Sequence, residues 1–327
     1  MKIIVFGKDG QLGKAFRGLF DGILSASSCD DLSIFYAGRV ECDLSDAASI
    51  THVLDNFQPD LIINASAYTA VDKAESEIDL AYAVNARAPE VMAQFAVKHS
   101  ATFLHYSTDY VFDGSKCGSY VEDDLRNPLG IYGKSKAAGE EAIAKAFEKS
   151  TSGQYAIFRT SWVYGDGGNF IRTILRLAKD REELKIIHDQ HGVPTSADWL
   201  ARVGLSLAFS SHHKLNMFPS GIYHAVPDGQ TTWHGLACLA VQSALNAGVA
   251  LKASPLAIKP ILAVEYPLPA PRPMNSRMET SKLKSVLAKQ LADGYSSYND
   301  ATDTPIFPAW DAMVQEYVAK LAAEGLI

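Results

Sequence analysis

The chain has 327 residues, of which 47% are hydrophobic and 20% charged, and its formal net charge is −7. This length is enough for one large α/β domain or for two smaller ones that share a cleft, and the composition is that of an ordinary globular protein. The acidic balance and the lack of a basic block argue against nucleic acid as a partner, because neutralising phosphates needs clustered Lys and Arg.

The four cysteines are Cys29, Cys42, Cys117 and Cys238, with no CxxC pair and no neighbouring histidine at zinc spacing. This spacing predicts reduced thiols in a cytosolic protein and no zinc site. The chain begins with MKIIVFG, too short an apolar run for a signal peptide, and no stretch approaches the length of a membrane span. We therefore expect a cytoplasmic protein that does not bind membranes.

Apolar, β-branched runs alternate with helix-compatible stretches through the first half of the chain. The strand-like runs are residues 2–6, 33–38, 60–66, 102–112 and 155–165. The helical patterns between them are residues 11–20, 47–57, 78–99 and 129–149. Such alternation predicts a parallel sheet covered by helices. We expect a Rossmann-like, doubly wound α/β domain that binds NAD(P) over residues 1–160.

The pattern becomes irregular after about residue 165. Residues 169–181 and 198–212 predict amphipathic helices. Residues 260–273 contain five prolines, so this segment is expected to be neither a helix nor a central strand but an extended loop that lines or covers something. Residues 161–327 are therefore expected to form mainly a smaller C-terminal α/β domain that binds substrate, with later segments returning to the first domain.

The turn GKDGQLG joins the first strand to the first helix and carries Gly7, Gly10 and Gly13. Such a turn presents unpaired backbone N–H groups at the positive end of a helix dipole, and its glycines let the backbone approach a pyrophosphate closely. The spacing GxxGxxG differs from the common GxGxxG. Its position directly after the first strand nevertheless favours dinucleotide binding over a plain tight turn.

The end of the second strand indicates which dinucleotide is bound. A carboxylate there would accept hydrogen bonds from the ribose 2′-OH of NAD, whereas a nearby arginine accommodates the 2′-phosphate of NADP. The chain has Arg39 there and no carboxylate before Glu41. This favours NADPH, with NADH also usable; the alternative is that Arg39 is a solvated arginine at a strand end. Asp43 and Leu44 are expected to meet the adenine after a third strand.

Polar residues Ser107, Thr108 and Asp109 fall near the end of the run 102–112. The carboxyl ends of parallel strands are where open α/β sheets bind ligands. A Ser-Thr-Asp sequence also suits a helix cap or a turn, so both readings stay open for these three residues.

Tyr132 and Lys136 lie one helical turn apart in YGKSK. About one such pair is expected by chance in this composition, so the surroundings must decide. Asn127 and Pro128 predict a helix start, with Asn127 as N-cap and Pro128 at the first position. Lys136 then falls on an inward-facing stripe, where a lysine is costly without a partner.

These residues suit proton transfer. A tyrosine with a pKa of about 10 is a poor acid–base catalyst near neutrality. The ammonium of Lys136 would lower the pKa of Tyr132 and could hydrogen-bond the nicotinamide ribose. Thr108 could share the substrate oxygen with Tyr132. The pattern thus predicts hydride transfer from the cofactor and a proton from the protein.

The order GxxGxxG, NAxA at residues 64–67, STDYVFDG and YxxxK resembles the extended short-chain dehydrogenase/reductase family. Longer motifs make the chain similar to the dTDP-4-dehydrorhamnose reductases within it. They are GKDGQLG, INASAYTAVDKAE, HYSTDYVFDG, YGKSKAAGE, RTSWVYG, DQHGVPTSADWLA and PAPRPMNSRMETSKL. The similarity runs in order from residue 1 to about 283, and PAW at Trp310 is similar to the family's C-terminal end.

The resemblance implies NADPH-dependent reduction of the 4-keto group of dTDP-4-dehydro-L-rhamnose to dTDP-L-rhamnose, a precursor of bacterial cell-surface polysaccharide such as lipopolysaccharide. By position, Tyr132 would donate the proton, Lys136 would hold the cofactor ribose and lower the tyrosine pKa, and Thr108 would tune that pKa. Turn and resemblance together assign cofactor binding to Gly7, Gly10, Gln11, Leu12, Gly13, Arg39, Asp43, Leu44, Ala67, Tyr68, Thr69, Tyr106, Tyr132 and Lys136. The implied substrate-binding residues are Thr108, Asp109, Trp162 and Arg272, although Arg272 could instead be a solvated arginine on a rigid loop.

The chain departs from the family in three places. Some members carry a glutamate soon after the glycine turn, where magnesium joins two subunits; here Ala15 stands nearby without a carboxylate. We therefore expect no metal and a monomer or weak homodimer. Ser66 and Tyr68 also differ from the residues often found there, and residues 288–305 look longer than the usual ending.

Two other functions remain open. One is another nucleotide-sugar enzyme of the same fold, such as a reductase for a different keto-deoxy sugar, an epimerase or a 4,6-dehydratase. Dehydratases place Asp-Glu after the threonine, whereas here Tyr110 follows Asp109. The other is a non-catalytic NADP-binding regulatory subunit, against which the intact Thr108, Tyr132 and Lys136 argue.

Overall fold

The central sheet of the protein has six parallel strands in the order β10-β5-β4-β3-β1-β2. The computed structural model describes residues 1–26, 32–210, 214–292 and 307–327, and every statement below concerns these. The strands are β1 Lys2–Phe6, β2 Ser33–Ala37, β3 Leu61–Asn64, β4 Thr102–Thr108, β5 Gln154–Thr160 and β10 Gly221–His224. Most of their side chains are buried, as the near-continuous apolar runs predict for a sheet covered on both faces.

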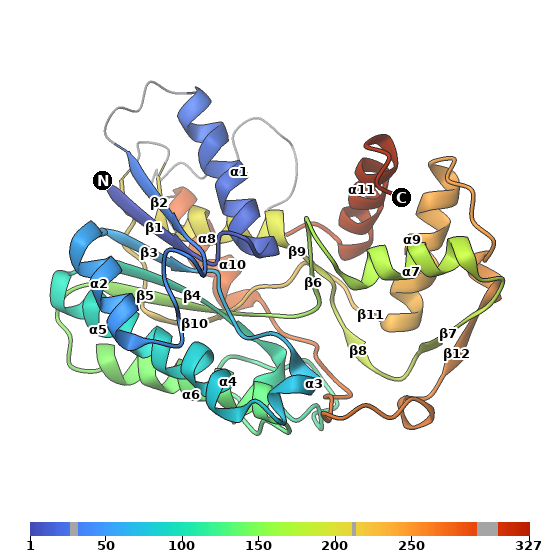
Figure 1. Cartoon of the computed structure of the whole chain (residues 1–327), viewed down its shortest axis with the longest axis horizontal. Helices are drawn as coiled ribbons and strands as arrows, with labels where there is room; N and C mark the ends of the chain where they lie inside the picture. Colours follow the sequence, from blue (N-terminus) through green and yellow to red (C-terminus); the bar gives the residue numbers. More distant parts are fainter. Residues whose placement is uncertain (27–31, 211–213, 293–306) are drawn as a thin grey trace.

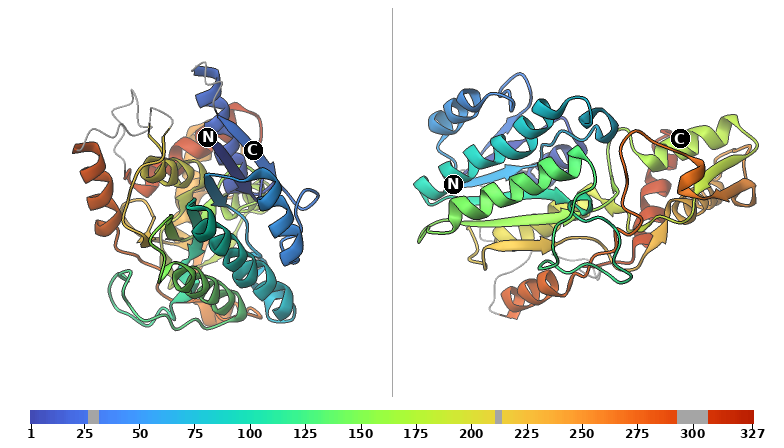
Figure 2. Two further views of the ribbon diagram at one scale, coloured as in Figure 1. Left: turned by 90° about the vertical axis from the view of Figure 1, so that its left-hand side faces the viewer. Right: turned by 90° about the horizontal axis from the view of Figure 1, so that it is seen from below.

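Helices cover both faces of this sheet (Figures 1 and 2). Successive residues of one strand point to opposite faces, so Ile3 and Val5 of β1 pack in one core while Ile4 and Phe6 pack in the other. The first core is closed by α1 Gln11–Ala26, α8 Ala197–Ala208 and α10 Ser281–Ala292. The second is closed by α2 Ala47–Phe57, α5 Ala88–His99 and α6 Ile131–Phe147. The predicted doubly wound α/β sheet is confirmed.

The stretch 78–99 is helical but is interrupted by a π turn. It consists of α4 Ile78–Tyr82, the π turn Ala83–Arg87 and then α5. Asn85 is buried in this π turn, and its side chain receives a hydrogen bond from the Tyr68 N–H at 2.8 Å and donates to the Tyr68 carbonyl at 3.1 Å. The π turn thereby holds the loop after β3 in place, a use of π turns common near functional sites.

The predicted start of the YGKSK helix is wrong. α6 begins at Ile131 with Gly130 as N-cap, because Asn127 is engaged elsewhere: its side chain donates to Asp113 Oδ2 at 2.8 Å. The carboxylate of Glu75, at the end of α3 Val71–Ala74, instead accepts the Ile131 N–H at 2.8 Å. A distant residue therefore caps this helix.

Four of the five predicted strand runs extend beyond the observed strands, and the runs 102–112 and 155–165 differ most. β4 ends at Thr108, whose side chain caps the 3₁₀ turn Asp109–Val111 by accepting the Tyr110 N–H at 3.2 Å, so the cap reading also holds here. The run 155–165 breaks into β5 and the short β6 Val163–Tyr164, because Trp162 between them has φ 48°. The turn with Asp43 and Leu44 directly follows β2 and leads into α2, so no third strand precedes it.

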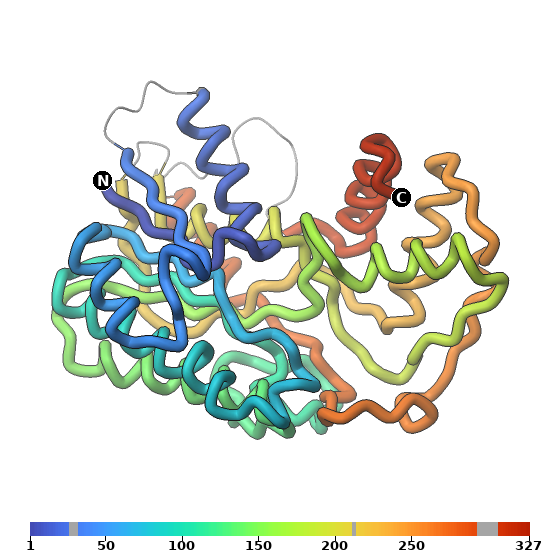
Figure 3. The backbone as a smooth tube through the Cα atoms, viewed as in Figure 1, coloured from blue at the N-terminus to red at the C-terminus, as the bar shows by residue number. Residues whose placement is uncertain are grey.

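A further set of helices and short strands lies beside the sheet (Figures 1 and 3). The helices are α7 Phe170–Asp180, α9 Trp233–Asn246 and α11 Trp310–Ala323, which share a third apolar core. The strands pair in twos and are β6 with β9 Thr195–Ser196, β8 His191–Gly192 with β11 Thr231–Thr232, and β7 Leu184–Ile187 with β12 Ile258–Ile261. Among the later elements, α8 and α10 pack on the central sheet and β10 forms its edge strand. The boundary at residue 160 stays a prediction.

The segment 260–273 is not one extended loop. Pro260 lies in β12, which pairs only with β7 and so is not a central strand, and the proline-free Ala263–Glu265 forms a 3₁₀ turn. The helix predicted at 198–212 ends at Ala208, and residues 211–213 lie outside the described part. Of the long ending at 288–305, α10 accounts for residues up to Ala292 and the rest also lies outside it. Among the described helices, none is both long and apolar enough to cross a membrane.

Candidate active site

A cleft of about 590 Å³ opens at the carboxyl ends of β1, β3 and β4. It is walled by the glycine turn, the loop after β3, the start of α6 and the loop around Trp162. The predicted site residues that line it are Gly10, Gln11, Leu12, Ala67, Thr69, Tyr106, Thr108, Asp109, Tyr132, Lys136 and Trp162. Segments far apart in sequence therefore meet where parallel strands end, as expected of ligand sites in open α/β sheets.

The glycine turn fits the phosphates of a dinucleotide. Gly7 has φ +88°, and a Cβ there would lie 2.9 Å from the backbone of Ala65 and Ser66. A Cβ on Gly13 would lie 2.0 Å from the Gly7 carbonyl oxygen, so only glycine lets α1 start this close to β1. The buried Oε1 of Gln11, in the first turn of α1, has no hydrogen-bond partner among the described residues. Free N–H groups at a helix N-terminus suit an anion.

A row of hydrogen-bonded side chains runs from the cleft into the protein. Thr108 Oγ1 bonds the Tyr132 phenol and donates to Asp109 Oδ1 at 2.9 Å, and the other oxygen of Asp109 accepts the Ser276 hydroxyl. Asp109 is only 2% exposed. Its burial raises the pKa of its carboxyl to about 6, against the lowering effect of the hydrogen bonds from Ser276 and Thr108.

Tyr132 is a neutral phenol in this setting. Burial raises its pKa to about 12; the hydrogen bond with Thr108 opposes the rise and the charge of Asp109 adds to it. We expected Lys136 to lower the pKa of Tyr132, but the protein groups around the phenol raise it. Lys136 is not among the groups that shift this pKa, and its ammonium bonds the Tyr106 carbonyl.

Lys136 is almost fully enclosed, at 1% exposure. Its ammonium donates to the Tyr106 carbonyl at 2.6 Å and lies 3.2 Å from His105 Nε2. Burial lowers the pKa of Lys136 to about 8, while the negative charge of Glu140 opposes that shift. At neutral pH this lysine is close to titration and is held at the floor of the cleft.

A buried ion pair supports that floor. Glu140, one helical turn after Lys136, receives two hydrogen bonds from Arg159 of β5, at 2.9 and 2.7 Å, and a third from the Ser107 hydroxyl at 2.6 Å. His105 meets Asn64 of β3 through Nδ1 at 3.0 Å. Sequence reasoning missed Glu140, Arg159 and His105, although the spacing of Lys136 and Glu140 on one helix could have indicated the first.

Two stacked tryptophans form another part of the cleft wall. The rings of Trp162 and Trp233 lie 3.7 Å apart between centroids at 17°, and both side chains line the cleft. Trp162 has φ 48°, which is rare for a bulky residue and costs about 1–3 kcal/mol. A Cβ on Gly192 would lie 2.6 Å from the Trp162 ring. Trp233 was missed because it follows Trp162 only after 70 intervening residues.

Several predicted site residues lie outside this cleft. The Tyr68 hydroxyl donates to Glu77 at 2.7 Å, and Arg272 makes two hydrogen bonds to Asp72, at 3.0 and 2.9 Å. Asp43 accepts the N–H and hydroxyl of Ser45 in the turn after β2. The other such residues are Gly7, Gly13, Arg39 and Leu44. The two glycines act by shaping the backbone behind the cleft.

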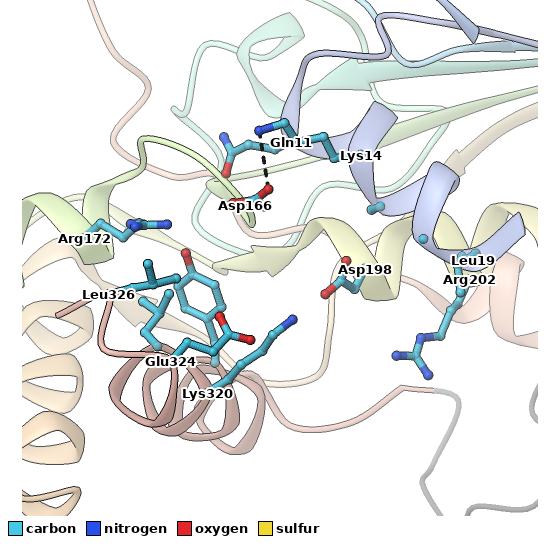
Figure 4. Close-up of a pocket in the computed structure, with 14 residues that line it drawn as sticks. Gln11, Lys14, Leu19, Asp166, Arg172, Asp198, Arg202, Lys320, Glu324 and Leu326 are labelled. Atoms are coloured by element: carbon cyan, nitrogen blue, oxygen red, sulfur yellow. Dashed lines mark ion pairs between the residues drawn. The ribbon is translucent and has the colours of Figure 1, made fainter. Parts of the chain in front are cut away.

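A second cavity adjoins this cleft, between α1, α8 and α11 (Figure 4). Lys14 of α1 and Asp166 of the loop before α7 form an ion pair at 3.3 Å and line both spaces. Tyr317 of α11 donates to the Gly165 carbonyl at 2.8 Å. The C-terminal helix thereby holds the loop that borders the first cleft.

The fold and the cleft define the class: a Rossmann-like α/β protein in which a glycine turn and a Tyr/Lys/Thr set line one cleft. The family model described as "RmlD substrate binding domain" matches residues 1–302. The dTDP-4-dehydrorhamnose reductase of Shigella flexneri is 41% identical over 294 residues, covering 90% of this chain and 94% of that protein. The chain therefore belongs to the dTDP-4-dehydrorhamnose reductases, a family of oxidoreductases.

Solved structures agree with this assignment. A dTDP-4-dehydrorhamnose reductase from Clostridium acetobutylicum superposes with a TM-score of 0.79 at 30% identity, covering 98% of this chain and 99% of that one. The enzyme of the same name from Bacillus anthracis, solved in complex with NADP, gives 0.76 at 28% identity, with coverages of 98% and 99%.

Proposed function

We propose that the protein reduces the 4-keto group of dTDP-4-dehydro-L-rhamnose to dTDP-L-rhamnose with NADPH, and that NADH also serves. The observation that carries this proposal is the convergence of the glycine turn with Tyr132, Thr108 and Lys136 in one cleft. The names of the relatives and the NADP bound to the Bacillus anthracis protein support it. A cytoplasmic location and a monomer or weak homodimer are part of the same proposal.

When bound, the nicotinamide supplies a hydride. The protein contributes binding and a proton. The glycine turn and the N-terminus of α1 would hold the pyrophosphate, and Lys136, which lines the same cleft, would hydrogen-bond a ribose hydroxyl. Ala67 and Thr69, in the loop after β3, line the same space.

Tyr132 is the proton donor. Because its pKa is about 12 among the protein groups, the phenol stays protonated at neutral pH and can donate to a developing alkoxide. Thr108 donates to Asp109 and is also hydrogen-bonded with the Tyr132 phenol, which orients Tyr132 before substrate binds. Lys136, with a pKa of about 8, is able to return a proton to the site.

Trp162 and Asp109 are proposed to shape the sugar site. Trp162 offers a ring face in the cleft, on which the apolar face of a deoxy sugar can stack. Asp109 acts through Thr108, because its carboxylate is occupied by Thr108 and Ser276. Arg272 reaches a nucleotide diphosphate only by leaving Asp72.

The test is oxidation of NADPH that depends on dTDP-4-dehydrorhamnose. Tyr132→Phe should lower turnover by about 10²–10⁴-fold, the usual contribution of a general acid, with NADPH affinity kept. Full activity of this variant would remove Tyr132 from the mechanism. NADPH binding without turnover of any keto-sugar nucleotide would favour the regulatory subunit instead.

A further inference from the structure

An ion pair joins the glycine turn to the residues that follow β2. The ammonium of Lys8, in GKDGQLG, pairs with Oε1 of Glu41, and the other carboxylate oxygen accepts the Gly38 N–H at 2.8 Å. The two side chains are 23% and 29% exposed. The bonds from Lys8 and Gly38 hold the pKa of Glu41 below its usual value, so Glu41 is a carboxylate.

The backbone is shaped to bring these groups together. β1 and β2 are paired up to Phe6 and Ala37, so the glycine turn and the residues after β2 start side by side (Figure 1). A Cβ on Gly38 would lie 2.5 Å from the Asp9 carboxylate and 2.9 Å from Cε of Lys8. A side chain at position 38 would therefore have to displace the ends of the Asp9 and Lys8 side chains.

The residues that follow β2 occupy the place where dinucleotide-binding folds distinguish NAD from NADP. In dinucleotide-binding folds the end of the second strand faces the adenosine ribose; a carboxylate there accepts the 2′-OH of NAD, and a cation there accommodates the 2′-phosphate of NADP. Glu41 and Lys8 supply both groups, each bound to the other. Arg39 is exposed next to them, and within the described residues no ion pair ties its guanidinium to a carboxylate.

We propose that the Lys8–Glu41 pair sets the selectivity of this protein between NADPH and NADH. Glu41 is the acceptor for a 2′-OH, Lys8 is the cation for a 2′-phosphate, and their mutual attraction restrains each of them, so that both cofactors are admitted. This inference rests on the cofactor site of the proposed function and names the residues that discriminate within it. In this proposal the main determinant of cofactor selectivity is the Lys8–Glu41 pair, and Arg39 contributes only additional positive charge.

Removing either charge should move selectivity in opposite directions. Glu41→Gln removes the repulsion of a phosphate and releases Lys8, while the amide oxygen can still accept the Gly38 N–H. Lys8→Gln removes the cation and leaves an unneutralised carboxylate beside the phosphate. We expect the ratio of Kd for NADPH to Kd for NADH to fall about tenfold in Glu41→Gln and to rise about tenfold in Lys8→Gln. A tenfold change in this ratio corresponds to about 1.4 kcal/mol of binding free energy.

The experiment measures Kd for both nucleotides by their fluorescence on the full chain, at low and high salt, for the unchanged protein, Lys8→Gln, Glu41→Gln and Arg39→Ala. Lys116→Gln and Asp124→Asn are the charge-matched controls, because Lys116 and Asp124 form a similarly exposed ion pair at 2.5 Å in a loop that touches neither strand end. Thermal unfolding establishes that each variant folds.

Opposite shifts in the Kd ratio, larger at low salt because exposed charges are screened, with no shift in the controls, support the inference. An unchanged ratio in both Lys8→Gln and Glu41→Gln overturns it, as does a ratio that changes only in Arg39→Ala. Failure of the unchanged protein to bind either nucleotide contradicts the proposed function itself. The two failures are therefore distinguishable.

Discussion

Lys136 donates to the backbone carbonyl of Tyr106 at 2.6 Å. It does not donate to the phenol of Tyr132, although Tyr132 precedes it by one turn of the same helix. The tyrosine instead bonds Thr108. The two residues of YxxxK therefore belong to two different hydrogen-bond systems in the same cleft: one ends at the carboxyl end of β4 and His105, the other at Asp109 and Ser276. Each system can be tested separately.

The buried ammonium of Lys136 should make stability depend on alkaline pH. Its pKa is about 8 in the folded protein and 10.5 in the reference state, so the unfolded chain binds more protons between these values and stability rises with pH across them. Lys136→Met lacks this contribution. The free energy of unfolding of the unchanged protein should gain up to about 3 kcal/mol relative to the variant between pH 7 and pH 10.

Urea unfolding of both proteins at several pH values measures that difference. Lys14→Met, which removes a half-exposed lysine, is the control and should show little pH dependence relative to the unchanged protein. A difference that stays constant from pH 7 to pH 10 would contradict a lowered pKa at Lys136.

Asp109 should determine the acid limb of activity. Its carboxyl has a pKa of about 6 because of burial. Above pH 6 Asp109 is a carboxylate that accepts the Thr108 hydrogen, and this holds Thr108 in the position that orients Tyr132. Below pH 6 the carboxyl is protonated and can itself donate a hydrogen bond to Thr108, which disturbs that arrangement. We expect turnover to fall as the pH drops through about 6.

Two variants check this assignment by their pH profiles. Asp109→Asn should lose the limb near pH 6. Ser276→Ala should move the limb to higher pH, because the hydrogen bond from Ser276 lowers the pKa of Asp109. A limb unmoved in both variants would assign it to another group. The same raised pKa means that Asp109 contributes stability below pH 4 that is lost as the pH rises through 6.

The buried pair of Glu140 and Arg159 should matter for stability far more than any surface pair. Glu140→Gln leaves the Arg159 guanidinium, 1% exposed, without its charge partner, which costs about 3–5 kcal/mol. Asp228→Asn, at the exposed pair with Lys284, should cost no more than about 1 kcal/mol. Urea unfolding of the two variants gives the comparison, and equal losses would count against a structural role for the buried pair.

Trp233 should affect the sugar nucleotide and not the cofactor. It holds Trp162 in the cleft by stacking, and such aromatic contacts contribute about 0.5–1.5 kcal/mol. Trp233→Ala should raise KM for dTDP-4-dehydrorhamnose by about threefold to tenfold, with Kd for NADPH unchanged. Trp233→Phe keeps a ring and should recover most of the loss; an unchanged KM in the alanine variant would exclude Trp233 from substrate binding.

The sequence by itself determined the architecture and the outline of the site. Alternating apolar runs and amphipathic stretches predict a parallel sheet covered by helices, because burial on two faces and the helical period are both written in local residue order. The glycines of GKDGQLG indicate the phosphate turn for the same local reason. The helix that carries Tyr132 and Lys136 was likewise predictable, except at its first residues.

The partners of those side chains were decided only by the tertiary structure. Glu75 caps α6 in place of Asn127, Tyr106 takes the hydrogen bond of Lys136, and Trp233 stacks on Trp162. Each contact joins segments far apart in sequence, and its geometry follows from how strands and helices pack. A residue's type states which bonds it can make, but only packing and burial decide which of them it makes and how its pKa shifts.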